Sequence, residues 1–169
     1  MTAPQPARLQ GLPPIASPAM RLLVLGSFPG ARSLALGQYY AHPQNHFWRI
    51  LGELWRVDMA ALDYAGRTAL LRARGLGLWD VYASCERAGS LDTAIRNAQV
   101  NDFAALARTC VQLQAIAHNG GESHRHARHS RALGLPVYRL PSTSPANATW
   151  SFARKRDAWA DVLGTHGLM

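Results

Sequence analysis

Four short apolar runs dominate the hydrophobic pattern, and each ends in glycine or polar residues. They cover residues 21–26, 76–82, 113–117 and 136–140. Short, nearly unbroken apolar runs of this kind are typical of strands buried on both faces of a parallel sheet. We therefore expect four such strands.

The segments between these runs carry helical spacing. One apolar face follows the i, i+3, i+4, i+7, i+8 pattern through Phe47, Ile50, Leu51, Leu54 and Trp55. Further helices are expected at about 60–74, 102–110 and 121–132, and a last one is expected to begin at Ser144-Pro145. Alternating strands and helices predict an α/β fold with helices on both faces of the sheet, a three-layer α/β/α sandwich.

The chain of 169 residues has the length of one domain. Residues 1–20 hold five of the ten prolines and lack a basic stretch followed by an apolar core. We expect them to form a flexible Pro-rich leader and not a signal peptide, with residues 21–169 as a single domain. No run of about 18 apolar residues occurs, which excludes a membrane-spanning helix.

The formal net charge of +8 suits a polyanionic partner such as nucleic acid. All but one of the 18 basic residues are arginine, and alanine is abundant, as the codon usage of a GC-rich genome would also produce. Charge alone therefore leaves nucleic-acid binding open.

The two cysteines, Cys85 and Cys110, lack a Cys-x-x-Cys spacing. We expect them to be reduced and buried, which points to a cytoplasmic location. Two thiols also cannot supply a four-thiolate iron–sulfur site.

Polar and glycine-rich loops follow the four predicted strands, at residues 27–30, 80–85, 118–121 and 141–147. Open parallel sheets bind ligands beyond the carboxyl ends of their strands, so a site is expected there. The first loop lacks both the Lys-Ser/Thr of a P-loop and the glycine triplet of a dinucleotide fold.

The first loop gains meaning from the tract that follows it. Gly26-Ser27-Phe28-Pro29-Gly30 precedes Ala41-His42-Pro43-Gln44-Asn45-His46-Phe47-Trp48 by some 11 residues. The pair resembles the mismatch-specific uracil/thymine DNA glycosylases, where a Gly-x-Asn-Pro-Gly loop precedes Ala-His-Pro-x-Asn-x-Phe-Trp. It is more similar still to the hypoxanthine-DNA glycosylases of the uracil-DNA glycosylase superfamily, whose Gly-Ser-x-Pro, Tyr-Tyr and Asn-x-Phe-Trp pattern is met throughout. Residues 78–81 and 140–145 also match, so the resemblance runs from about residue 21 to 159.

This resemblance implies a four-stranded parallel sheet between helices and a monofunctional enzyme that cleaves the bond between a deaminated base and deoxyribose. A base inside duplex DNA must be flipped into a pocket and stacked on an aromatic ring. Phe47 matches the stacking position, although it could simply head the apolar helix face. Asn45 is the expected catalytic residue, an amide that orients water, because Phe28 stands where the superfamily usually has Asp or Asn. A helix N-cap is the competing interpretation of Asn45.

Asp80 matches a base-reading Asn of related families. Its carboxylate could accept N1–H of hypoxanthine while a backbone N–H near Phe47 donates to O6, although uracil also offers an N–H beside a carbonyl. Capping of the following turn is an equally ordinary use of Asp. Ser27 and Phe28 of the first loop are expected to line the base pocket.

The loop Pro141, Ser142, Thr143 and Ser144 matches the motif that grips phosphates in the superfamily. Asn119 and Gly120, at the end of the third predicted strand, are expected to face another phosphate. Leu140 stands where many relatives have His, which argues against efficient uracil excision. The His- and Arg-rich segment 121–132 lacks metal-ligand spacing, so no metal is expected.

We therefore expect a DNA-deoxyinosine glycosylase that starts base excision repair as a monomer, needs no cofactor, and acts on DNA containing deaminated bases. Two alternatives stay open. One is a mismatch-specific uracil/thymine DNA glycosylase, and the other is a non-catalytic binder of damaged or single-stranded DNA.

Overall fold

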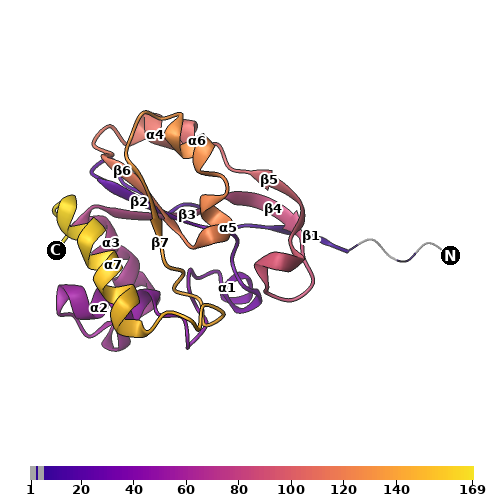
Figure 1. The fold of residues 1–169 in the computed structure, drawn as a ribbon, viewed down its shortest axis with the longest axis horizontal. Helices are drawn as coiled ribbons and strands as arrows, with labels where there is room; N and C mark the ends of the chain where they lie inside the picture. Colours follow the sequence, from indigo (N-terminus) through magenta and orange to yellow (C-terminus); the bar gives the residue numbers. More distant parts are fainter. Residues whose placement is uncertain (1–2, 4–5) are drawn as a thin grey trace.

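The computed structural model describes residue 3 and residues 6–169, and its centre is a parallel sheet of four strands in the order β3-β2-β6-β7 (Figure 1). The strands are β2 (Leu22–Gly26), β3 (Leu76–Asp80), β6 (Ala115–Asn119) and β7 (Val137–Leu140). All three neighbouring pairs are parallel. The four strands expected from the apolar runs, and the α/β fold class, are confirmed.

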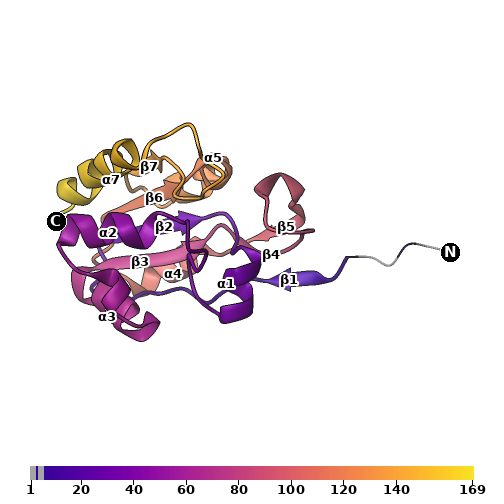
Figure 2. The ribbon, with the colours of Figure 1, turned by 90° about the horizontal axis from the view of Figure 1, so that it is seen from below.

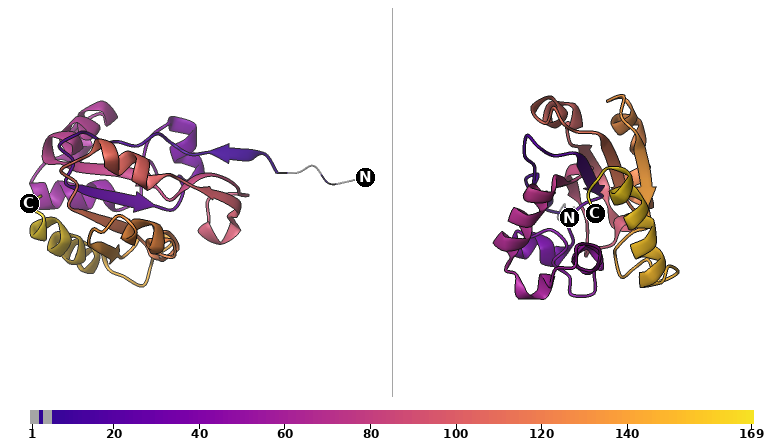
Figure 3. Two further views of the ribbon diagram at one scale, coloured as in Figure 1. Left: turned by 90° about the horizontal axis from the view of Figure 1, so that it is seen from above. Right: turned by 90° about the vertical axis from the view of Figure 1, so that its left-hand side faces the viewer.

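Helices cover both faces of this sheet (Figures 1 and 3). One face carries α2 (Phe47–Trp55), α3 (Tyr64–Arg74) and α7 (Phe152–Thr165), and the other carries α4 (Phe103–Thr109) and α6 (Ala127–Arg131). Side chains of β2 alternate between two separate apolar cores. Val24 lies in the first core and Leu25 lies in the second. In the first core α2 packs against α7 (Figure 2), and this contact holds the start of α2 near the carboxyl edge of the sheet.

A second sheet, of three antiparallel strands, was not expected from the sequence. It has the order β1-β4-β5, with β1 (Arg8–Gln10), β4 (Tyr82–Glu86) and β5 (Arg96–Val100). β4 follows β3 almost directly and carries polar positions that break the apolar pattern. Its pairing with β5 is interrupted by register shifts, so neither strand has a regular alternation to find in the sequence.

The expected leader is wrong for residues 8–20. Backbone bonds pair Ile15 with Leu78 of the parallel sheet, and Met20 is buried in the second core. Pairing with β4 satisfies the backbone of β1, which is a tertiary contact that local composition does not encode. Residues 1, 2, 4 and 5 lie outside the described residues.

Three helix boundaries also differ from the sequence expectation. The last helix begins at Phe152, where the Ser151 side chain accepts the backbone N–H of Arg154 at 3.2 Å, and not at Ser144-Pro145. The expected helix 121–132 is two short helices, α5 (Gly121–His124) and α6. The first loop leads into α1 (Ala31–Leu36), which was not expected. Across the described residues we find no helix with both the length and the apolar character needed to cross a membrane.

Candidate functional site

The carboxyl ends of the four parallel strands lie together at one edge of the sheet. Gly26 of β2 is in register with Asp80 of β3, and Asn119 of β6 is in register with Leu140 of β7. The topology therefore gathers the first loop, Asp80, Asn119 and the loop 141–145 at one edge, as expected for a parallel sheet.

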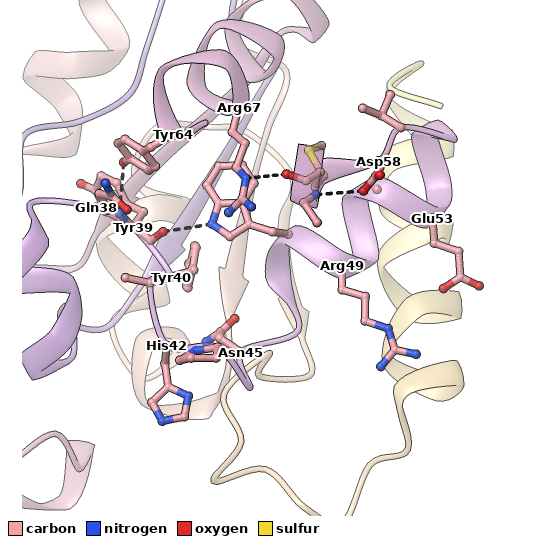
Figure 4. Close-up of a pocket in the computed structure, with 17 residues that line it drawn as sticks. Gln38, Tyr39, Tyr40, His42, Asn45, Arg49, Glu53, Asp58, Tyr64 and Arg67 are labelled. Atoms are coloured by element: carbon pink, nitrogen blue, oxygen red, sulfur yellow. Dashed lines mark hydrogen bonds between the residues drawn. The ribbon is translucent and has the colours of Figure 1, made fainter. Parts of the chain in front are cut away.

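Asn45 lies in the turn that leads into α2. Its Oδ1 accepts the backbone N–H of Phe47 at 2.9 Å, so the capping interpretation describes one use of this side chain. Asn45 also lines two hollows, of about 690 and 530 Å³, which share Pro43, Asn45 and Arg49 in their linings. Figure 4 shows Asn45 and His42 at one end of the larger hollow. The half-exposed amide therefore borders both hollows, where solvent can reach it.

Phe47 is fully buried at the start of α2. One face of its ring is stacked by Tyr40, with ring centroids 4.3 Å apart and planes at 27°. Trp48 and Trp159 approach it edge-on, at centroid distances of 5.0 and 5.8 Å. Neither of the two hollows has Phe47 in its lining. Phe47 is therefore a core residue, and the Tyr40 ring already occupies one of its faces.

Asp80 is a buried carboxyl with an unpaired oxygen. Its exposed fraction is 4%, and no group among the described residues forms a hydrogen bond with its buried Oδ2. Burial, followed by the negative charge of Asp92, raises the pKa of Asp80 to about 7, against the opposing charge of Arg87. A β-carbon at Gly26 would collide with Asp80 Oδ1, so glycine is required at this position. The carboxyl thus keeps an unused acceptor beside the first loop.

Asn119 ties the loop 141–145 to the tract that contains Asn45 and Phe47. Its Oδ1 accepts the backbone N–H of Thr143 at 3.0 Å, while its Nδ2 donates to Thr143 Oγ1 at 3.0 Å and to the Tyr40 hydroxyl at 3.1 Å. The backbone N–H of His46 then donates to the Thr143 carbonyl at 2.9 Å. Asn119 and Thr143, both expected to contact DNA, therefore point into the protein and act as a brace.

The rest of the expected phosphate loop is more accessible. Pro141, Ser142 and Ser144 are each half-buried. Gly120 has a φ of +96°, and a β-carbon there would stand 2.9 Å from Ser142 Cβ, so Gly120 shapes the loop by its missing side chain. Of the residues expected to contact DNA, Pro141, Ser142 and Ser144 present the most surface.

The first loop does not bring Phe28 to the site. Its ring is buried in the core on the opposite face of the sheet from Phe47, with the Arg87 guanidinium 5.2 Å above it. Ser27 donates its hydroxyl to Asp92 Oδ1 at 2.7 Å. The direction of Phe28 is set by apolar packing in a core that the loop sequence alone does not reveal.

Lys155 is a site residue that the sequence analysis missed. It is the chain's only lysine, it is 1% exposed, and its Nζ lies 3.3 Å from His46 Nδ1 and 3.4 Å from the Ser144 carbonyl. Burial lowers the pKa of Lys155, and burial with the neighbouring Lys155 and Arg49 charges lowers the pKa of His46. The single lysine among so many arginines was the available signal. Lys155 joins α7 to the turn that holds His46 and to the loop 141–145. It also lines the smaller hollow.

The His- and Arg-rich segment forms no candidate metal centre. Within the part of the chain that the structure describes, no three His, Cys, Asp or Glu side chains are grouped as metal ligands. His118 is buried between the hydroxyls of Ser123 and Ser130, at 2.7 and 2.8 Å. Both of its ring nitrogens are thereby occupied.

Comparison with known proteins adds three findings. A family model described as "Uracil DNA glycosylase superfamily" matches residues 13–163, which begins inside the expected leader. Two proteins named "Hypoxanthine DNA glycosylase" are similar over 154 residues, 91% of this chain and 97% of each relative: that of Methanosarcina barkeri (strain Fusaro / DSM 804) at 36% identity and that of Methanosarcina acetivorans at 32%. A solution NMR structure of a protein from Methanosarcina acetivorans, described as a candidate uracil DNA glycosylase, superimposes with a TM-score of 0.85 at 31% identity, covering 96% of this chain and 99% of that one.

Proposed function

Because the chain belongs to the uracil DNA glycosylase superfamily, we propose that it excises hypoxanthine from deoxyinosine in DNA by hydrolysing the N-glycosidic bond. The match to the family model confirms the superfamily expected from the sequence, and the named relatives confirm the expected DNA glycosylase activity. Two relatives named as hypoxanthine DNA glycosylases support the choice of base.

The unpaired carboxylate oxygen of Asp80 is the observation that carries the proposal. An orphaned buried acceptor costs free energy, which a ligand hydrogen can recover. Hypoxanthine presents N1–H beside the O6 carbonyl, so the Asp80 carboxylate can accept the first while a backbone N–H donates to the second. Adenine reverses both groups, with an unprotonated N1 and a 6-amino group. Asp80 thereby distinguishes the deaminated base from its parent.

Asn45 supplies the hydrolytic step in this proposal. Cleavage passes through an oxocarbenium-like state, and water must be held against C1′ of the sugar. Because Oδ1 already accepts the backbone N–H of Phe47, the amide plane is fixed before substrate arrives. A fixed amide orients water without a proton-transfer group of its own, and the water proton leaves with the departing base or to solvent.

Leu140 gives the choice of a purine further support. It stands where many relatives carry a histidine, and here it is 3% exposed and part of the first core. No imidazole at this position can steady a uracil anion. The partner in the proposal is accordingly DNA that contains deaminated purines.

Labelled duplexes containing deoxyinosine, deoxyuridine or mismatched thymine test the proposal, with abasic sites cleaved by alkali after incubation. We expect wild type to cut the deoxyinosine strand and Asn45→Ala to lose most of that activity, by about 100-fold or more for a positioned catalytic group. Asp63→Asn, at the exposed cap of α3, is a control for the loss of a polar side chain elsewhere. Cutting of deoxyuridine or mismatched thymine alone would instead establish a uracil/thymine enzyme, and binding without cutting would overturn the hydrolytic proposal.

A further inference from the structure

The smaller of the two hollows carries positive charge that no carboxylate balances. Arg49 and Lys155 both line it, and no Asp or Glu is among the described residues of its wall. Within the described part of the chain, neither Arg49 nor Lys155 forms an ion pair. Glu53, one turn from Arg49 on α2, is paired with Arg156 at 2.8 Å instead. The hollow therefore suits an anion.

Lys155 decides where His46 carries its ring hydrogen. The Lys155 Nζ lies 3.3 Å from His46 Nδ1. An ammonium donates hydrogen bonds and cannot accept them, so Nδ1 is the acceptor and the hydrogen of the neutral ring is on Nε2. Burial and the charges of Lys155 and Arg49 lower the pKa of His46, which favours the same neutral ring. His46 therefore presents one N–H donor, at Nε2.

This donor is available to a ligand in the hollow. Within the described residues, the one side-chain hydrogen bond of His46 is the contact of Nδ1 with Lys155. His46 is half-buried and lines the smaller hollow, and its ring packs on Phe152 at 86°, with centroids 5.2 Å apart. The exposed Arg49 guanidinium lies 4.0 Å over the same Phe152 ring. Phe152 thereby keeps the imidazole and guanidinium donors close to each other.

The hollow adjoins the expected catalytic amide. Asn45 and Pro145 both line it, so it lies between the turn before α2 and the loop 141–145. Thr143 and Asn119 are bonded to each other, which leaves the phosphate contacts expected of them to other groups. A strand that presents a nucleotide to Asn45 carries a phosphate on each side of that nucleotide. One of these phosphates is therefore expected at the hollow.

We propose that the smaller hollow is a phosphodiester subsite, where His46 Nε2–H and the Arg49 guanidinium hold a phosphate next to the flipped nucleotide, with Lys155 behind His46. The inference rests on the proposed function, since the phosphate belongs to the strand on which Asn45 acts. Lys155 is a positioning residue: its ammonium aims the His46 donor, and its charge favours an anion in front of that donor.

A phosphodiester matches the chemistry of these groups. Its two free oxygens can accept from the planar guanidinium of Arg49 and from the imidazole of His46 at the same time. Its negative charge also compensates the buried ammonium of Lys155, which lacks a carboxylate partner among the described residues. The subsite therefore recognises backbone charge and carries no information about the base.

Single-phosphate substitution tests the subsite without any cleavage. Fluorescence anisotropy measures binding of a duplex with a tetrahydrofuran abasic analogue, and methylphosphonate linkages on either side of the analogue each remove one phosphate charge. We expect one linkage to weaken wild-type binding about tenfold, as for one charge-assisted hydrogen bond. His46→Leu should weaken binding of the unmodified duplex about tenfold and reduce the effect of that linkage to within about twofold, because both changes remove the same contact.

The exchange of His46 for Gln separates a donor from a merely structural side chain. The Gln amide can accept from Lys155 and donate to the phosphate, so His46→Gln should bind within about threefold of wild type. Imidazole ¹⁵N shifts should show the hydrogen of His46 on Nε2 in wild type, and a mixture of both tautomers in Lys155→Met. An Nδ1–H tautomer in wild type would overturn the assignment of the donor.

Two charge deletions on α7 provide the matched control. Lys155→Met should weaken binding of the unmodified duplex about tenfold, because the His46 donor is no longer aimed. Arg156→Gln removes a charge that Glu53 and Asp157 already pair, so binding should change less than about threefold. Equal losses in Lys155→Met and Arg156→Gln, or a methylphosphonate effect that persists in full in His46→Leu at every linkage, would overturn the subsite.

The binding cycle and the cutting assay can fail separately. Loss of the methylphosphonate effect in His46→Leu would uphold the subsite even if wild type left deoxyinosine uncut, and the proposed reaction alone would then be wrong. Cutting of deoxyinosine by wild type without this loss would uphold the reaction and overturn the subsite.

Discussion

Replacing Asp80 by Asn tests the electrostatics of the site directly. The pKa of Asp80 lies at about 7 in the fold, against 3.8 without burial. Between these values the folded state binds a proton that the unfolded state has lost, so stability falls as pH rises. The contribution of the neutral carboxyl is fully present below pH 3.8 and is gone once pH exceeds about 7. Asn cannot ionise, and Asp80→Asn should escape this loss.

The expected size follows from the linkage relation. From pH 5 to pH 8 the free energy of unfolding of wild type should fall by up to about 2–3 kcal/mol relative to Asp80→Asn. Urea unfolding at several pH values measures the difference, and contributions from other groups cancel between the two proteins. Asp161→Asn, an exposed change on α7, is the control for the same carboxyl-to-amide replacement outside the site. A pH-independent difference for Asp80→Asn would show that this carboxyl is solvated and refute the reasoning.

The same variant has an expected effect on catalysis. If the ionised carboxylate accepts N1–H, kcat/KM on deoxyinosine duplexes should rise with pH through about 7 in wild type. Asp80→Asn loses the charge of the acceptor, and a drop of about 10- to 100-fold is expected, with that rise abolished. Activity that declines over the same pH range would mean that the protonated acid is the working form.

Three further changes probe Gly26, Asn119 and Lys155, which lie around the site. Gly26→Ala places a methyl group against Asp80 Oδ1, and should cost about 1–3 kcal/mol of unfolding free energy in urea; a cost that persists in an Asp80→Gly background would contradict this cause. Asn119→Ala removes the brace to Thr143 and should cost about 2–3 kcal/mol while weakening deoxyinosine cutting, whereas wild-type stability would show that the loop holds without it. Lys155→Met removes a buried cation whose pKa is lowered, so any gain in stability should shrink as pH rises toward 10.5; a gain that grows with pH would refute a desolvated ammonium.

The sequence by itself determined the parallel sheet and the place of the site. Apolar runs and helical spacing are local properties, and parallel strands bring their carboxyl ends together whatever the loops contain. The match of the tract 39–48 to a glycosylase pattern likewise needed no structure. These features gave the strands, most helices, and the gathering of Asp80 with the loop 141–145.

Only the tertiary structure decided which of the gathered side chains are free to act. Thr143 and Asn119 were expected to contact DNA, but they bond to each other because burial requires their polar groups to find partners. Phe28 turns to the far core, and Tyr40 covers Phe47. The second sheet depends on the pairing of β1 with β4, which is distant in the chain, and on an irregular register between β4 and β5, so no local pattern marked it. Burial, which sets the pKa and the unpaired oxygen of Asp80, is a property of the folded chain alone.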